Sequence, residues 1–538
     1  MSPSPADSLR IATVERAVAM PDVRPLAVDS RVPALLRATI VALSILHLVP
    51  PLLRPAQFLQ DDSYFYLQIA SNIVAGRGET FHEITPTNGY HPLWMAAAVA
   101  AFVLAEGEKV AALQVAVALQ VLLTLGTLLL FYRLARLMEL ESGLFGLALV
   151  LVFLGGTTIF GSEAHLNALM LTAGLVSLWS AVDGHHPWRW FVTGLMFGLA
   201  ILARLDNVFV VAALAGFGVM HGRREGAAVL TRAALGGLGG ALVLTPYVAW
   251  NMARFGHITP ISGAIKSTFP LFDLDVSRLG PAGQLAAVFG VASLVIGQFL
   301  DPCRRRRVFW RGLGAGVVIH ALYVAGFTDH YTFWPWYYVP GFLAAGLAAA
   351  YLPGWVAGKR QRAVALVRPL VVLLTAATLL GGTARTWLKA FNPLQLGPAV
   401  VDVPINEYRW PDEFGRWMKA HLPPDARLFA FDWPGAIAYY SDLKIVPMDG
   451  LVNDFRYNDE LLAAGPEAYL CSHGLRLFFG LVDEGAAIQQ FVVSAPLYRR
   501  PAGLLTVHAE DVVVRTRDVV SRPDDAPPFA IWRVRCPT

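Results

Sequence analysis

This chain turns from apolar to polar at Gln60-Asp61-Asp62-Ser63-Tyr64-Phe65-Tyr66-Leu67-Gln68-Ile69-Ala70, just after an apolar run at residues 33–53. From Ser63 to Val74 the apolar side chains recur at helical spacing on one side, and polar side chains such as Gln68 lie on the other. Glycines at positions 76 and 78 provide its end. We expect an amphipathic helix on the outer leaflet, with both aspartates at its N-terminus.

The acidic pair invites two interpretations. One aspartate can simply cap the helix, since Asp accepts hydrogen bonds from the first amides and complements the helix dipole. A cap needs only one carboxylate, however. A second carboxylate beside lipid is costly unless it has a partner or a task. The pair Asp61-Asp62 is therefore a candidate for chemistry.

The composition indicates a membrane protein. Hydrophobic residues make up 55% of the 538 residues and charged residues 15%, against about 25% in soluble proteins. The mean hydropathy is +0.51. The net charge of +4 suggests no nucleic-acid partner. Residues 1–31 lack the apolar core of a signal peptide, so the first apolar run is expected to remain as an anchor.

Apolar runs predict about eleven transmembrane helices, because about 20 apolar residues span the hydrocarbon core. They are 33–53, 110–132, 143–161, 166–182, 190–203, 206–220, 228–249, 282–300, 311–327, 337–353 and 364–382. The run at 92–105 has only about fourteen residues, which is closer to an interfacial or re-entrant segment than to a span, and the charge distribution can decide. If it does not cross and the N-terminus is cytoplasmic, every later Arg and Lys cluster falls inside, as the positive-inside rule requires. The loops 54–109, 250–281 and 328–336 are then outside, as is everything after residue 382.

The C-terminal part changes character. Short strand-like runs alternate with helical stretches and predict a soluble α/β domain. The expected organisation is a cytoplasmic tail at 1–32, a transmembrane module at 33–382 and an extracytoplasmic domain at 383–538. Cys471 and Cys536 could pair if that domain lies in an oxidising compartment.

These features resemble the GT-C glycosyltransferases, multi-span enzymes that use polyprenyl-phosphate-linked sugars. The resemblance rests on the acidic pair after the first span, the amphipathic helix, the glycine turn and Pro92-Leu93-Trp94. It implies two juxtamembrane helices in the first outer loop and a catalytic aspartate there. By position, the resemblance favours Asp61 as the catalytic base, with Asp62 supporting it or binding substrate or metal.

Three further segments are similar to the bacterial terminal arabinofuranosyltransferase-like branch of that superfamily. They are Gly161-Ser162-Glu163-Ala164, Ala203-Arg204-Leu205-Asp206 and the Pro-x-x-x-x-x-Lys loop that runs from Pro260 to Lys266. Members of the branch more often have Pro-Asn where this chain has Pro-Ile-Ser, a departure that leaves the sugar open.

The expected chemistry needs a carboxylate base for the acceptor hydroxyl and cations for the leaving phosphate. Arg204 and Lys266 are the candidate cations, although Arg204 could instead pair structurally with Asp206, and Lys266 could be an ordinary snorkelling lysine. Glu163 could bind substrate or help hold a divalent cation, and no spacing decides whether a metal is needed.

Two polar segments of the outer loops complete the candidate site. Tyr90 and His91 could face the sugar, although Asn-Gly and prolines explain this turn by themselves. His330 could contact phosphate, although the aromatic residues around it are also typical of a membrane interface.

The sequence thus predicts a glycosyltransferase of the bacterial inner membrane that moves a sugar from a polyprenyl-phosphate donor to a hydroxyl. The acceptor would be an envelope glycan, lipid or protein at the outer face, and one aspartate base would invert the anomeric centre. The alternatives are a transporter or flippase of lipid-linked sugars, or an inactive assembly scaffold. A transporter would place its ionisable residues near mid-span.

Overall fold

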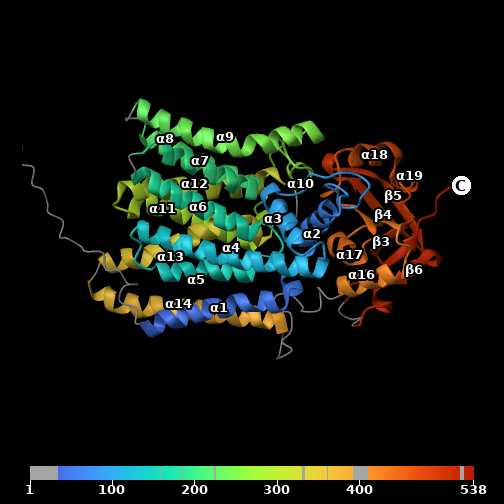
Figure 1. Ribbon diagram of the computed structural model, residues 1–538, viewed down its shortest axis with the longest axis horizontal. Coiled ribbons are helices and arrows are strands. Elements are labelled where there is room, and N and C mark those ends of the chain that lie inside the picture. The colour runs from blue at the N-terminus through green and yellow to red at the C-terminus, as the bar shows by residue number, and fades with distance from the viewer. Residues whose placement is uncertain are drawn as a thin grey trace, which may run out of the picture.

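The computed structural model describes residues 34–157, 159–183, 186–222, 226–329, 334–359, 361–391, 410–521 and 526–537. Long helices lie side by side in a bundle, and a domain of strands and short helices sits at one end of it (Figure 1). We call this end the domain end. The opposite end, where α8 turns into α9 and α11 into α12, is called the far end.

A helix occupies every apolar run that the sequence predicts as a span. The bundle helices are α1 (Ala34–Leu53), α4 (Lys109–Leu137), α5 (Gly143–Val152), α6 (Ala164–Asp183), α7 (Trp188–Ala203), α8 (Val208–Gly222), α9 (Ala227–Phe255), α11 (Gly280–Val295), α12 (Arg304–Phe327), α13 (Val339–Lys359) and α14 (Gln361–Phe391). Within the described residues, eight helical segments are long and apolar enough to cross a membrane, whereas α1, α5 and α7 are shorter apolar helices. The chain is a multi-pass membrane protein.

The last bundle helix is longer than the sequence predicts. It continues past residue 382 to Phe391 and packs along α1. The indole Nε1 of Trp387 donates a hydrogen bond to the carbonyl of Leu46 at 3.0 Å, which ties these extra turns to α1.

The first loop at the domain end contains two helices, α2 (Asp61–Val74) and α3 (Pro92–Leu104), as the resemblance implies. The helix α2 does not lie on an open membrane surface, because every residue from Ser63 to Asn72 is buried. Its polar side is covered as well: Asn72 donates to the carbonyls of Thr80 and Phe81 at 2.8 and 3.1 Å. The expected surface helix is thus an interior helix between the bundle and the C-terminal domain.

Glycines let α7 and α9 approach closely. A Cβ at Gly194 would lie 2.0 Å from the carbonyl oxygen of Gly236, and a Cβ at Gly239 would lie 2.2 Å from that of Phe191. Small residues commonly permit such backbone contact between membrane helices. The helix α9 makes most of its helix contacts with α7 and few with α8.

The C-terminal part is an α/β domain, as predicted. Its described strands form a five-stranded sheet in the order β2-β1-β3-β7-β6, in which β1 is parallel to β2 and β3 while β7 is antiparallel to β3 and β6. The strands are β1 (Arg427–Ala430), β2 (Lys444–Pro447), β3 (Leu477–Leu481), β6 (Val512–Arg515) and β7 (Phe529–Arg533), beside a hairpin of β4 (Ile488–Ala495) and β5 (Arg500–His508).

The sequence at residues 505–514 is typical of one strand, but the structure divides this stretch. A 3₁₀ turn at Ala509–Asp511 splits it, so its first part ends β5 of the hairpin and its second part forms β6 of the main sheet. A run of apolar residues cannot by itself reveal that the chain changes sheet.

The helices of this domain are α16 (Trp410–His421), α17 (Pro434–Ser441), α18 (Arg456–Ala464) and α19 (Pro466–Ser472). The helices α16 and α17 lie between the sheet and the bundle (Figure 1), and α17 packs against α2. Buried residues of α17 belong to the same apolar core as those of the bundle. The two parts therefore share a continuous core at the domain end.

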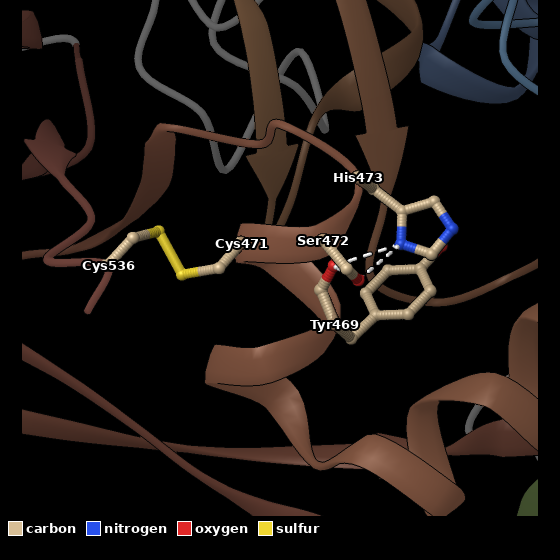
Figure 2. The surroundings of a disulfide bond; sticks show 5 residues. All are labelled: Tyr469, Cys471, Ser472, His473 and Cys536. Carbon is tan, nitrogen blue, oxygen red and sulfur yellow. Dashed lines mark hydrogen bonds between the residues drawn. A yellow bond between two sulfur atoms is a disulfide. The ribbon is translucent and has the colours of Figure 1, made fainter. Parts of the chain in front are cut away.

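A disulfide joins Cys471, next to the end of α19, to Cys536 in the C-terminal tail (Figure 2). The neighbouring His473 ring lies against Tyr469 and away from the disulfide, as Figure 2 shows. The bond closes a segment of 65 residues and fixes the tail to the domain.

Candidate functional site

A cavity of about 560 Å³ lies at the domain end, where the first loop, the turns before α6 and α8, and the short helix α10 (Ile261–Lys266) meet. The residues predicted from sequence that line it are Asp62, Tyr90, His91, Glu163, Arg204, Asp206 and Lys266. Residues as distant in the sequence as Asp62 and Leu451 thus converge on one cavity. His330 lies outside the described residues.

A buried chain of charges forms one wall. The Arg204 guanidinium pairs with Glu163 through Nη1 and with Asp206 through Nη2 at 2.9 Å. The ring of Tyr337 lies 4.1 Å from the guanidinium carbon. The expected pairing of Arg204 with Asp206 is present, and Glu163 is a second carboxylate partner. Buried charges in a membrane protein are stable only when paired in this way.

Glu163 also contacts two residues of the first loop. Tyr66 donates its hydroxyl proton to Oε2 of Glu163 at 3.0 Å, and the imidazole Nε2 of His91 lies 3.9 Å from Oε1. Burial alone would raise the pKa of Glu163, but His91 and Arg204 outweigh it and hold the pKa below its usual value. Glu163 is therefore ionised, and it holds Arg204 in place.

Lys266 and Asp62 face the cavity from another side. The Lys266 ammonium donates to the Tyr337 hydroxyl at 2.7 Å. Burial lowers the pKa of Lys266, but Tyr337 and Asp62 outweigh it, so the pKa is raised and the lysine is charged. Burial raises the pKa of Asp62, Lys266 opposes this, and Glu163 adds to it. No described residue makes a hydrogen bond or ion pair to the Asp62 carboxylate, which leaves its acceptor positions for a ligand.

Asp61 points elsewhere. Its carboxylate accepts hydrogen bonds from the backbone amides of Gly435 at 3.0 Å and Ala436 at 2.8 Å, in the first turn of α17. Asp61 does not line the cavity. It caps a helix, as one sequence interpretation allowed, but the helix belongs to the C-terminal domain. A Cβ at Gly435 would lie 2.4 Å from the backbone oxygen of Asp61, so glycine is needed at this contact.

Further contacts hold the α/β domain over the first loop. Lys109 forms an ion pair with Asp442 at 2.6 Å, and the Thr87 hydroxyl donates to the carbonyl of Asn453 at 3.1 Å. A Cβ at Gly89 would lie only 2.0 Å from the carbonyl oxygen of Leu451, which lines the cavity. The polar turn at 85–92 is therefore the junction between the bundle and the domain.

Sequence reasoning missed several lining residues. His320 of α12 lies 3.3 Å from Asp206, and Tyr66 and Tyr337 contact the charged wall. A histidine within an apolar run is a detectable signal, since ionisable residues in spans usually face an interior. Asp449 of the α/β domain is not a lining residue, but it interacts electrostatically with Asp62: burial, with a contribution from Asp62, raises the pKa of Asp449 to about 6. Among the described residues, no group of three or more His, Cys, Asp or Glu side chains is arranged to hold a metal ion.

Comparison with known proteins identifies the fold. The structure is similar to that of ArnT from Cupriavidus metallidurans in the apo state, with a TM-score of 0.55 and 14% identity over 87% of this chain and 97% of that chain. It is similar to the same protein bound to undecaprenyl phosphate, with a TM-score of 0.53 and 15% identity over the same shares. These likenesses establish the GT-C fold that the sequence resemblance predicts.

Residues 403–512, within the C-terminal region, match a family model described as a domain of unknown function (DUF8728). No curated protein sequence matches the chain.

Proposed function

We propose that this protein is a membrane glycosyltransferase that moves a sugar from a polyprenyl-phosphate donor to a hydroxyl acceptor. The observation that carries the proposal is the cavity at the domain end, in which the carboxylate of Asp62 and the cations Lys266 and Arg204 converge. The GT-C fold supports it, as does the undecaprenyl phosphate bound to ArnT, a protein of similar structure.

Asp62 is the proposed catalytic base. As the acceptor oxygen attacks the anomeric carbon, its proton passes to the Asp62 carboxylate, and the bond from the anomeric carbon to the phosphate oxygen breaks. The electron pair leaves with the polyprenyl phosphate. A single displacement of this kind inverts the anomeric centre. The half-buried carboxylate has unoccupied acceptor positions and a raised pKa, both of which suit a base near neutral pH.

The cations have different parts in this scheme. Arg204 is neutralised by Glu163 and Asp206, so it shapes the wall and offers only its remaining donors to a ligand. Lys266 is bonded to a neutral tyrosine hydroxyl and keeps its charge for the donor phosphate. Stabilising the charge that develops on the leaving phosphate is the main electrostatic demand of the reaction.

His91 and Tyr90 are proposed to contact the sugar, and the Leu451 loop is proposed to help enclose the acceptor. The envelope glycan, lipid or protein that supplies the hydroxyl belongs to the same proposal.

The reaction is proposed to occur at the outer face of the bacterial inner membrane. The disulfide supports an oxidising compartment for the α/β domain, and the Arg-rich loops at the far end support a cytoplasmic position for that end.

The test is donor turnover by the full-length protein in membranes. A panel of polyprenyl-phospho-sugars is supplied with an envelope-glycan extract, and free polyprenyl phosphate is followed by mass spectrometry. Release from one donor, with a KM that rises in Lys266→Gln, supports the proposal. If vesicles instead move a labelled lipid-linked sugar across the bilayer without releasing polyprenyl phosphate, the flippase alternative is correct.

A further inference from the structure

The short helix α10 brings Lys266 to the cavity but is too short to hold its own position. It has six residues, whereas an isolated helix needs about 12–15 residues to be stable in water. Its neighbours must therefore fix it. At its N-terminal end, the side-chain oxygen of Asn88 accepts the backbone amide of Ile261 at 3.0 Å. This contact comes from the first loop and lies at the end of α10 away from Lys266.

The α/β domain packs against the apolar side of α10. Ile261 and Ile265 of the helix are buried. They form a small apolar cluster with Leu451 of the domain, and Phe455 and Leu497 of the same domain pack against this cluster. The position of α10 therefore depends on the α/β domain as well as on the bundle.

Arg499 of the α/β domain holds the end of α10 that carries Lys266. Its Nη2 donates to the carbonyl of Ile265 at 3.2 Å and to the carbonyl of Ser267, which are the residues on either side of Lys266. Its Nε pairs with the carboxylate of Asp329. The last carbonyls of a helix have no partner within the helix, so the guanidinium supplies donors that α10 lacks. One side chain thus fixes the backbone on both sides of Lys266.

The turn that carries Arg499 is itself fixed to the domain. It lies between β4 and β5. The backbone amide of Leu497 donates to the side-chain oxygen of Asn458 at 3.0 Å, and the hydroxyl of Tyr498 donates to Asp459 at 2.5 Å. Both acceptors lie on α18, so Arg499 extends from a turn that is attached to the body of the α/β domain.

We propose that Arg499 is a positioning residue of the donor site. It holds α10 so that the Lys266 ammonium stays where the donor phosphate binds. The inference rests on the proposed function, in which Lys266 stabilises the leaving phosphate. Position matters there, because a shift of about 1 Å caused by a distant substitution can cost about a hundredfold in rate. The α/β domain is then part of the donor site, although its Arg499 does not touch the donor.

The test compares Arg499→Gln with Arg500→Gln, which removes the same charge from the next, exposed position. The kcat and the KM for the polyprenyl-phospho-sugar that the wild type consumes are measured on the full-length protein in membranes, at equal amounts of inserted protein. Arg499→Gln should raise this KM about tenfold, and Arg500→Gln should leave it unchanged. Damage to the domain alone would lower kcat by reducing the amount of active protein and would leave the KM unchanged.

A double substitution tests whether Arg499 acts through Lys266. In a Lys266→Gln protein, adding Arg499→Gln should change the donor KM by less than about twofold, because the ammonium that Arg499 positions is already absent. Fully additive effects of the two substitutions, or a donor KM in Arg499→Gln equal to that of the wild type, would overturn the proposal.

Hydrogen exchange makes the test independent of turnover. Peptides that cover residues 261–268 should exchange about fivefold faster in Arg499→Gln than in Arg500→Gln, whereas peptides from β3 and β7 should exchange alike in both. If α10 is loosened in this way but the wild type consumes no donor, the proposed function fails while the hold of Arg499 on α10 stands. Equal exchange of α10 in the two variants overturns the inference whether or not a donor is consumed.

Discussion

The contact of Asp61 with α17 predicts how the α/β domain responds to two substitutions. The carboxylate accepts the amides of Gly435 and Ala436 at 3.0 and 2.8 Å. Asp61→Ala removes both acceptors at a half-buried position that water can partly reach. Removal of an N-cap costs about 0.5–2 kcal/mol and a buried donor without a partner about 1–3 kcal/mol, so we expect a loss of about 1–2 kcal/mol.

The expected result is faster local opening of α17. A loss of this size increases the hydrogen exchange of the Gly435 and Ala436 amides by about five- to thirtyfold. Peptides from α18, in the same domain but distant from Asp61, provide the internal control. Mass spectrometry of exchange in the full-length protein measures both regions in one sample.

The companion substitution Asp61→Asn is expected to have a smaller effect. Burial raises the pKa of Asp61 despite the two amide hydrogen bonds that lower it, so contact with α17 favours the protonated form. An acid with a raised pKa stabilises the contact more at low pH, and this contribution is lost as the pH rises through that pKa. Asparagine has no charge to bury, but its single side-chain oxygen replaces the two oxygens that accept the amides of Gly435 and Ala436. It should protect α17 better than Asp61→Ala does, with less pH dependence than the wild type, and exchange as fast as in Asp61→Ala would refute this reasoning.

Three other predictions concern the charged wall, the base and the topology. Arg204→Met leaves both carboxylate partners buried and unpaired, which should cost about 3–5 kcal/mol, and adding Glu163→Gln should recover part of the loss in a thermal aggregation assay. Lys266→Gln should shift the acid limb of the pH–rate profile to higher pH, because Lys266 lowers the pKa of Asp62 and the base works only when it is deprotonated. An unchanged acid limb would exclude Asp62 as the base. A membrane-impermeant maleimide should label the reduced half-cystines of the α/β domain in intact spheroplasts and should label Cys303 only after lysis, whereas the reverse pattern would invert the proposed topology.

The sequence predicts the local structure of the site well. The limits of α2 follow from its helical spacing and its glycines, and the expectation that 92–105 is a short helix of the first loop agrees with α3. The motifs around Glu163, Arg204 and Lys266 meet at one cavity, because each lies at the domain end of a helix in an alternating bundle.

What the sequence does not predict depends on contacts between distant segments. The polar side of α2 suggests a surface helix, but the first loop folds back over Asn72, and α17 of the distant α/β domain packs on α2 as well. Asp61 and Asp62 are neighbours at the start of one helix, so the local sequence does not show which of them faces the cavity. Only the position of α17, whose amides bind Asp61, distinguishes the two. The ion pair between Glu163 and Arg204 likewise forms only because the turn before α6 lies beside the turn before α8. Neither sequence motif shows that these two turns are neighbours.

The most direct test of the central claim compares Asp61→Asn and Asp62→Asn in one turnover assay, at equal amounts of inserted protein. The donor is the polyprenyl-phospho-sugar that the wild type consumes, and released polyprenyl phosphate is measured. We predict that Asp61→Asn retains most of the wild-type rate and that Asp62→Asn loses about 10²–10⁴-fold, the usual contribution of a positioned base. An active Asp62→Asn beside an inactive Asp61→Asn would contradict the proposal and return the catalytic role to Asp61.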